Sequence, residues 1–366
     1  MSIVKKLHTP LCDLLGTRLP IIQAPMAGGT TTPALVAASS KAGALGSFGF
    51  AYTQPEAMQR DVEAVRALTD APINLNFFVN AQPAAIAPES QSAAIAAVAG
   101  YYQALGLPAP TPARTPYAPD LNAQLSMAEN IKPAVLTFHL NDLPAERLKR
   151  LRALGIKTGG SATCVAEALH LEAIGVDFII AQGGEAGGHR GTFQRNPYDA
   201  MTGTLALTRL IVRAVNIPVV AAGGIMDGAG IAAVLALGAQ GAQLGTAFLP
   251  CTESGAPRIH KDSLLAARED TTTMTEKFTG KPARGLVNRY MREMNASNAP
   301  QLAFPAQGVL SGPLRAASGK AGNPDYLAMW AGQAAPLSRE LSAAQLVITL
   351  EHETLEALDR LAALRR

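Results

Sequence analysis

Short apolar runs alternate with amphipathic stretches along most of this 366-residue chain, and this alternation constrains the fold more than any other feature. Each run is bounded by Gly, Pro or polar residues, as is typical of a buried β-strand. The predicted strands are the eight runs PIIQAPM, ALGSFGF, INLNFFV, AVLTFHL, IKTGGSA, DFIIAQG, IPVVAAG and GAQLGTAF. The stretches between them, such as TPALVAASSKAG and CVAEALHLEAIG, have the spacing of amphipathic helices, and most end at a glycine or a charged residue.

Eight parallel strands joined mainly by helices favour a closed α/β architecture, the (β/α)8 TIM barrel. Crossovers between parallel strands are right-handed, and a series of this number closes naturally into a barrel. A doubly wound open sheet usually has fewer strands and one switch point. The length agrees with a single barrel domain, because such barrels routinely exceed ~250 residues.

Two segments interrupt the alternation. Residues 80–133 are rich in Ala, Pro and Gln and are too long for an ordinary crossover, so we expect a helical insertion after the third strand. Residues 271–366 follow the eighth strand, and we expect this C-terminal extension to pack over the barrel mouth and cover the active site. The barrel domain is thus predicted over residues 1–270, insertion included. The extension ends in a predicted helix whose charged face fits either surface packing or an oligomer contact such as a homodimer.

Composition excludes several classes of protein. A content of 48% hydrophobic and 16% charged residues suits a large core, and the net charge of +3 forms no basic block, which argues against a nucleic-acid partner. Cys12, Cys164 and Cys251 are odd in number and widely spaced, so neither a disulfide framework nor a metal site is expected. We find no signal peptide and no apolar run long enough for a membrane span, and we expect a cytoplasmic protein.

Glycines gather where the last two predicted strands end. Gly223 and Gly224 follow the seventh strand, and Gly245 and Thr246 follow the eighth. Glycine lets backbone N–H groups approach an anion closely, and a following helix N-terminus adds favourable partial charge. These positions predict the usual phosphate site of a barrel, although tight turns alone would also explain each pair.

A third glycine-rich stretch, AQGGEAGGHRGTF, follows the sixth predicted strand and carries His189. An imidazole titrates near neutral pH and can act as an acid or a base. By itself, a loop histidine is more often an ordinary surface residue. After the first strand, Pro25 and Met26 precede two glycines, where a flat ligand can lie against the backbone or the chain simply turns.

Four ordered motifs resemble the nitronate monooxygenases, formerly called 2-nitropropane dioxygenases, and class I of that family in particular. They are PIIQAPMAGGTTTPALVAASSKAGALGS, AQGGEAGGHRGTF, IPVVAAGGIMDGAGIAAVLALGAQGAQLGTAF and the C-terminal WAGQ. The resemblance implies an FMN-dependent barrel that oxidises alkyl nitronates, such as propionate 3-nitronate, with molecular oxygen. The products would be a carbonyl compound and nitrite, and no nicotinamide would be needed.

The resemblance also implies roles for particular residues. Those expected to contact FMN are Pro25, Met26, Asn76, Gln182, Gly187, Gly224, Gln243, Leu244, Gly245, Thr246 and Gln333. Amide side chains suit the polar edge of the flavin, and Gly and Thr suit its phosphate. His189 matches the family's active-site histidine. His139, Lys320 and Tyr326 are expected to contact the substrate, the last two through a carboxylate.

Two other functions stay open. Related flavin barrels share the EAGGH loop and act as NAD(P)H-dependent reductases of quinones or enoyl thioesters. A non-catalytic barrel that binds a phosphorylated ligand would keep the glycine-rich phosphate site without the chemistry. No GxGxxG dinucleotide motif follows a strand, which disfavours the reductase only modestly.

Overall fold

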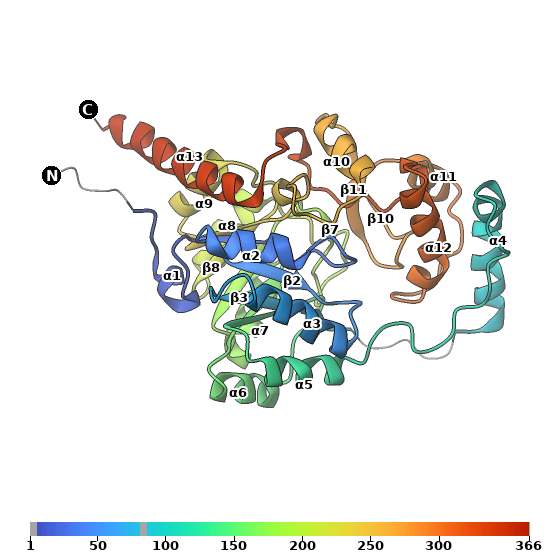
Figure 1. Cartoon of the computed structure of the whole chain (residues 1–366), viewed down its shortest axis with the longest axis horizontal. Coiled ribbons are helices and arrows are strands. Elements are labelled where there is room, and N and C mark those ends of the chain that lie inside the picture. The colour runs from blue at the N-terminus through green and yellow to red at the C-terminus, as the bar shows by residue number, and fades with distance from the viewer. Residues whose placement is uncertain (1–5, 81–85, 366) are drawn as a thin grey trace.

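The computed structural model describes residues 6–80 and 86–365 of the chain (Figure 1). Eight parallel strands form one sheet in the spatial order β1-β9-β8-β6-β5-β4-β3-β2. Their bounds are β1 (Ile21–Gln23), β2 (Gly46–Gly49), β3 (Ile73–Phe78), β4 (Val135–His139), β5 (Lys157–Ala162), β6 (Phe178–Gln182), β8 (Val219–Ala222) and β9 (Gly241–Leu244). A parallel bridge between Ile22 and Leu45 brings β1 beside β2, so the sheet nearly closes on itself. The predicted (β/α)8 barrel is confirmed, and each of the eight predicted runs contains a strand.

Alternation within the strands explains the two sides of the barrel wall. In β6, Phe178 and Ile180 belong to the cluster inside the barrel, whereas Ile179 packs with the surrounding helices. The period of two along a strand produces this division. The same packing explains why position 159 in β5 is a glycine, since a Cβ there would lie 2.4 Å from the Phe178 ring. The large ring therefore occupies the space that a side chain on β5 would need.

A ring of helices surrounds the strands (Figure 1). The helices that follow the strands in order are α2 (Pro33–Lys41), α3 (Pro55–Arg66), α5 (Leu121–Ile131), α6 (Ala145–Ala153), α7 (Val165–Ile174), α8 (Thr204–Val212), α9 (Gly228–Ala236) and α13 (Ala343–Ala363); α1 (Pro10–Leu15) precedes β1. The C-terminal helix α13 packs against α9 and α2 and so takes the eighth helical place of the barrel. Ser342 and Gln345 form a capping box at its start. Within the described ranges, no helix has the length and apolar character required to span a membrane.

A second group of elements lies beside the barrel (Figure 1). It consists of α4 (Pro88–Ala104), α10 (Arg258–Leu265), β10 (Thr272–Thr275), β11 (Ala283–Leu286), α11 (Arg289–Ala296), α12 (Gln307–Lys320) and the short 3-10 turns η2 (Pro324–Tyr326) and η3 (Ala335–Leu337). The 3-10 turn η1 (Thr246–Phe248) instead follows β9 directly and packs in the barrel core. Segment 80–133, predicted as an insertion, contains α4 and α5, and its residues 81–85 lie outside the described ones. Helix α4 packs on the C-terminal extension, where the Tyr102 hydroxyl donates to the Leu310 carbonyl at 2.6 Å.

One strand pairing joins the extension to the barrel. The two-residue strand β7 (Gly188–His189) belongs to the glycine-rich loop after β6, and it pairs antiparallel with β11. His189 lies opposite Ala283 in this register. The pairing holds the histidine loop and the extension together at the carboxyl ends of the strands, where barrels carry their sites.

Candidate active site

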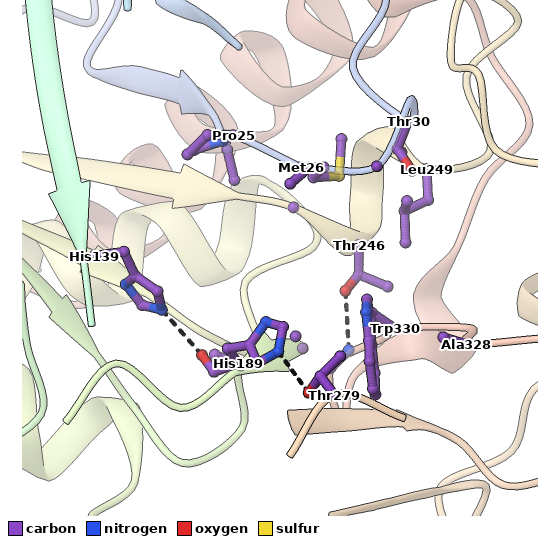
Figure 2. A pocket seen from close by; sticks show the side chains of 18 of the residues that line it. Pro25, Met26, Thr30, His139, His189, Thr246, Leu249, Thr279, Ala328 and Trp330 are labelled. Atoms are coloured by element: carbon purple, nitrogen blue, oxygen red, sulfur yellow. Dashed lines mark hydrogen bonds between the residues drawn. The ribbon is translucent and has the colours of Figure 1, made fainter. Parts of the chain in front are cut away.

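A cavity of about 660 Å³ opens at the carboxyl ends of the barrel strands (Figure 2). Its walls come from the strand ends, from the glycine-rich loop and from the C-terminal extension. Eleven of the residues predicted from sequence line it: Pro25, Met26, Asn76, His139, Gln182, Gly187, His189, Gly224, Gln243, Gly245 and Thr246. The fold thus gathers residues from distant segments into one cavity, as the motifs predict.

Four other predicted residues lie outside this lining. Leu244 is buried in the core, where its carbonyl accepts from Ala24 N at 2.8 Å. Lys320 is exposed at the end of α12. Tyr326 is buried against Tyr101, at 5.6 Å between ring centroids. The side chain of Gln333 is exposed, and only its backbone N–H bonds inward, to the Glu185 carbonyl. The structure therefore does not bring the Lys320 and Tyr326 side chains to the substrate side of the cavity.

His189 is buried and has a defined tautomer. Its Nε2 lies 2.9 Å from the Thr279 hydroxyl oxygen, which lies 3.2 Å from the Lys281 carbonyl (Figure 2). A carbonyl only accepts, so the single hydroxyl proton of Thr279 is donated to Lys281. This arrangement favours a proton on His189 Nε2, which is donated to Thr279. The lone pair is on Nδ1, which has no hydrogen-bond partner among the described residues and belongs to a cavity-lining side chain.

The environment keeps this imidazole neutral. Burial is the main cause that lowers the pKa of His189 to about 3, and the nearby His139, Lys281 and Arg315 lower it further. A low dielectric disfavours the charged form of an imidazole, and neighbouring cations act in the same direction. The cavity therefore presents a neutral base in a field that attracts anions.

His139 supports the loop that carries His189. Its Nε2 donates to the His189 carbonyl at 3.1 Å (Figure 2). Gln182 Nε2 donates to the same carbonyl at 3.0 Å. A Cβ on Gly191 would lie 2.4 Å from the His139 ring, so the loop passes the ring only with glycine at this position. Burial lowers the pKa of His139 to about 4, which leaves it neutral and suited to donate one hydrogen bond.

The glycine-rich part of the cavity lining has properties that suit an anion. Gly223 and Gly224 have φ of 113° and 70°, a conformation that favours glycine. The backbone N–H of Gly224 donates to no backbone carbonyl among the described residues. The Thr246 hydroxyl accepts from Gly332 N at 3.0 Å, which joins this end to the WAGQ segment. Free backbone donors beside a helix start suit a phosphate.

A buried acceptor in the same lining also requires a partner. Gln243 Oε1 is buried and has no hydrogen-bond partner among the described residues, yet its side chain lines the cavity. Buried polar atoms in proteins nearly always have a partner. A ligand hydroxyl, such as those on a ribityl chain, would supply the missing donor.

Several lining residues were missed from the sequence. Phe78, Phe304 and Trp330 surround His189, with ring centroids at 5.4, 5.4 and 5.8 Å. Thr279 and Arg315 also line the cavity. Trp330 begins the recognised WAGQ motif and could have been selected, but the other four have no local signal that separates them from ordinary core or surface residues.

Fold and cavity together define a class: a (β/α)8 barrel whose cavity is lined by glycines after its last two strands and by a buried histidine after β6. A family model described as nitronate monooxygenase matches residues 8–353 of the chain. The chain therefore belongs to the nitronate monooxygenase family of flavin-dependent oxidoreductases, and the resemblance drawn from its motifs is confirmed.

Individual proteins agree with this assignment. A nitronate monooxygenase of Paraburkholderia phytofirmans is 42% identical over 354 residues, which cover 96% of each chain. One from Pseudomonas aeruginosa is 41% identical, over 93% of this chain and 97% of its own. Among solved structures, nitroalkane oxidase from Streptomyces ansochromogenes is 40% identical with a TM-score of 0.89, over 96% of this chain and 99% of its own. FabK from Thermotoga maritima is 27% identical with a TM-score of 0.77, over 98% and 99%.

Proposed function

We propose that this protein uses FMN to oxidise alkyl nitronates with molecular oxygen, and that it releases a carbonyl compound and nitrite. The observation that supports the proposal is the buried His189, whose Nε2 bonds to Thr279, in a cavity that Gly224, Gly245 and Gln243 also line. A cofactor phosphate and a reacting anion thus each have a place in the same cavity. The family assignment supports the same reaction class.

The glycine-rich part of the lining fits FMN in particular because it suits one phosphate and one polyol chain. Gly224, Gly245 and Thr246 would hold the phosphate, and Gln243 would accept from the ribityl chain. Asn76 lines the cavity and would face the polar edge of the ring. When bound, FMN supplies the electron acceptor that takes electrons from the substrate and passes them to oxygen.

His189 acts on the proton of the substrate. With neutral nitroalkanes, Nδ1 would remove the proton from the carbon that bears the nitro group, while Nε2 stays bonded to Thr279. The nitronate formed beside the ring raises the proton affinity of the imidazole, because an opposite charge favours imidazolium. Preformed nitronates need no such step, and the positive charge of Lys281 near His189 would attract them as anions.

Oxygen consumption tests the proposal directly. Protein whose bound flavin has been identified by its spectrum is supplied with a panel of nitronates in an oxygen electrode, and nitrite is measured in the same samples. We expect oxygen uptake and nitrite release in proportion. Absence of both across the panel would reject the proposed reaction.

A second candidate is the NAD(P)H-dependent reductase, which the EAGGH loop shared with related flavin barrels leaves open. Anaerobic mixing with NADH or NADPH separates the two functions. Rapid bleaching of the flavin would favour the reductase, and a flavin that stays oxidised would favour nitronate oxidation.

The cellular location is also a proposal. All three cysteines are free and buried, as a reducing compartment allows. We therefore propose that the protein acts in the cytoplasm.

A further inference from the structure

One wall of the cavity is a face of α12 that carries almost no side-chain volume. Gly308, Gly312 and Ala316 are spaced four residues apart, so they share one face of the helix, and all three line the cavity. A Cβ on Gly308 would meet nothing within 4 Å, and one on Gly312 would meet only an Arg315 nitrogen at 3.9 Å. The protein itself leaves the space beside this wall open.

Arg315 on the same helix is a cation without an acidic partner. Its Nη2 donates to the Gly308 carbonyl at 3.2 Å, while its Nε is buried without any hydrogen-bond partner among the described residues. Burial lowers the pKa of Arg315, and the neighbouring groups that act on its charge are the phenols of Tyr52 and Tyr290. The residues outside the described ranges include no Asp or Glu that would pair with it.

An aromatic wall joins this guanidinium to the histidine. Phe78 contacts Tyr52 at 6.0 Å between ring centroids, and both Phe78 and Phe304 contact His189 at 5.4 Å. The charge of Arg315 also acts on His189. The lining near Arg315 therefore combines aromatic rings, two glycines without neighbouring atoms where their Cβ would be, and a cation without an acidic partner.

We propose that Arg315 binds the carboxylate of an extended ω-carboxyalkyl nitronate, and that Gly308 and Gly312 leave room for its alkyl spacer. A planar guanidinium pairs with a carboxylate through two hydrogen bonds, and here the pairing would satisfy the orphaned Nε. The spacer would lie against Phe78 and Phe304. The inference rests on the proposed function, because the reacting carbon of this substrate is placed at His189.

Steady-state kinetics on matched substrates tests the role of Arg315. Nitronates of 3-nitropropionate, 4-nitrobutanoate and 6-nitrohexanoate are compared with nitronates of the same carbon number that carry no carboxylate. We expect KM to be about 10- to 100-fold lower for the carboxylated six-carbon substrate, as is typical of a charge-assisted contact. Arg315→Met should remove this preference with kcat nearly unchanged, and Arg315→Lys should restore part of it.

Lys320→Met is the matched control, because it removes the same charge from the same helix outside the cavity. It should keep the wild-type preference. A preference that survives in Arg315→Met, or is absent from the wild type, would overturn the inference.

Substitution of Gly308 and Gly312 tests whether the alkyl spacer of the substrate lies against them. Gly308→Leu and Gly312→Leu should raise KM for the six-carbon substrate at least tenfold more than for the three-carbon one, since the side chain fills this space. Leu is also a better helix former than Gly. Gly319→Ala is the control, because Gly319 itself does not line the cavity and its Cβ would meet one lining side chain, Leu327, only at an ordinary 3.7 Å. Equal effects at all chain lengths would contradict the assignment of the wall.

Calorimetric titration with hexanoate separates this inference from the proposed function. Hexanoate carries the spacer and the carboxylate but no reacting group. If the flavin-loaded wild type binds hexanoate and Arg315→Met does not, the carboxylate site at Arg315 is supported even if no nitronate is oxidised. If nitronates are oxidised but hexanoate binds wild type and variant alike, the function stands and the site at Arg315 is refuted.

Discussion

The assignment of the base to one nitrogen of His189 leads to a sharp prediction for Thr279. Its hydroxyl accepts from Nε2 at 2.9 Å and donates to Lys281, which leaves the lone pair on Nδ1. Thr279→Val keeps the shape of the side chain and removes the acceptor. Without it, Nε2–H has no partner, and the other tautomer, with a proton on Nδ1, becomes competitive. That tautomer cannot take a proton from a nitroalkane through Nδ1.

The size of the effect follows from the lost hydrogen bond. A buried donor left without its partner costs about 1–3 kcal/mol, which corresponds to a loss of about 5- to 150-fold in kcat/KM for neutral nitroalkanes. A preformed nitronate has already lost the proton, so its oxidation should change by less than about threefold. Thr279→Ser keeps the hydroxyl and should return nitroalkane activity to within about threefold of the wild type.

Oxygen uptake by flavin-saturated enzyme is measured with a nitroalkane and with its nitronate, which gives both activities. The flavin spectrum of each variant serves as the control for an intact site. Equal losses on the two substrates, or a Ser variant as impaired as the Val variant, would refute the tautomer argument, because a merely structural contact does not distinguish the two substrates.

Three further predictions concern the same cavity. His189→Asn should keep FMN, lose roughly 10²–10⁴-fold of any nitroalkane activity and leave measurable nitronate oxidation; equal loss in oxygen-electrode assays of both substrates would reject the base role. Gly245→Ala should raise the Kd of FMN at least about tenfold in fluorescence titration. The new Cβ would meet only Ala24, at 3.5 Å, so it should hinder the bound ligand without destabilising the fold. An unchanged affinity would show that Gly245 does not contact FMN. Burial lowers the pKa of His189 to about 3 and those of His139 and His260 to about 4, whereas unfolded histidine titrates near 6.5. The unfolded state therefore binds more protons in this interval, and the free energy of unfolding from urea titrations should fall by up to about 1.4 kcal/mol per pH unit per histidine as pH drops from 6.5 toward 4; a flat profile would contradict this burial.

The barrel could be predicted because its signals are local. A run such as DFIIAQG identifies β6 by itself, and the crossover rules leave few ways to assemble eight such strands. The place of α13 was harder to predict. The helix itself is visible from its capping box and periodicity, but its packing as the eighth barrel helix depends on the path of residues 245–342 between β9 and α13.

The candidate site also contains some residues that local sequence predicts and others that it does not. The residues found from sequence lie in motifs where several unusual residues stand together, as His189 does among five glycines. Lys320 and Arg315 show the limit of that reasoning. Both are cations on α12, and only the orientation of the helix face decides that Arg315 lines the cavity while Lys320 is exposed.

The chemistry of His189 is decided at the tertiary level. Its motif predicts a titratable group near a flavin, and nothing local to the loop indicates which nitrogen holds the proton. That choice depends on Thr279, 90 residues away, which the pairing of β7 with β11 brings into contact. A chain with the same glycine-rich loop but no hydroxyl at that place would keep the fold and the histidine, yet it would leave the base with an undefined tautomer. The C-terminal extension therefore contributes Thr279 to the surroundings of His189 as well as lining the cavity, and under the proposed function its sequence would set what the histidine can do.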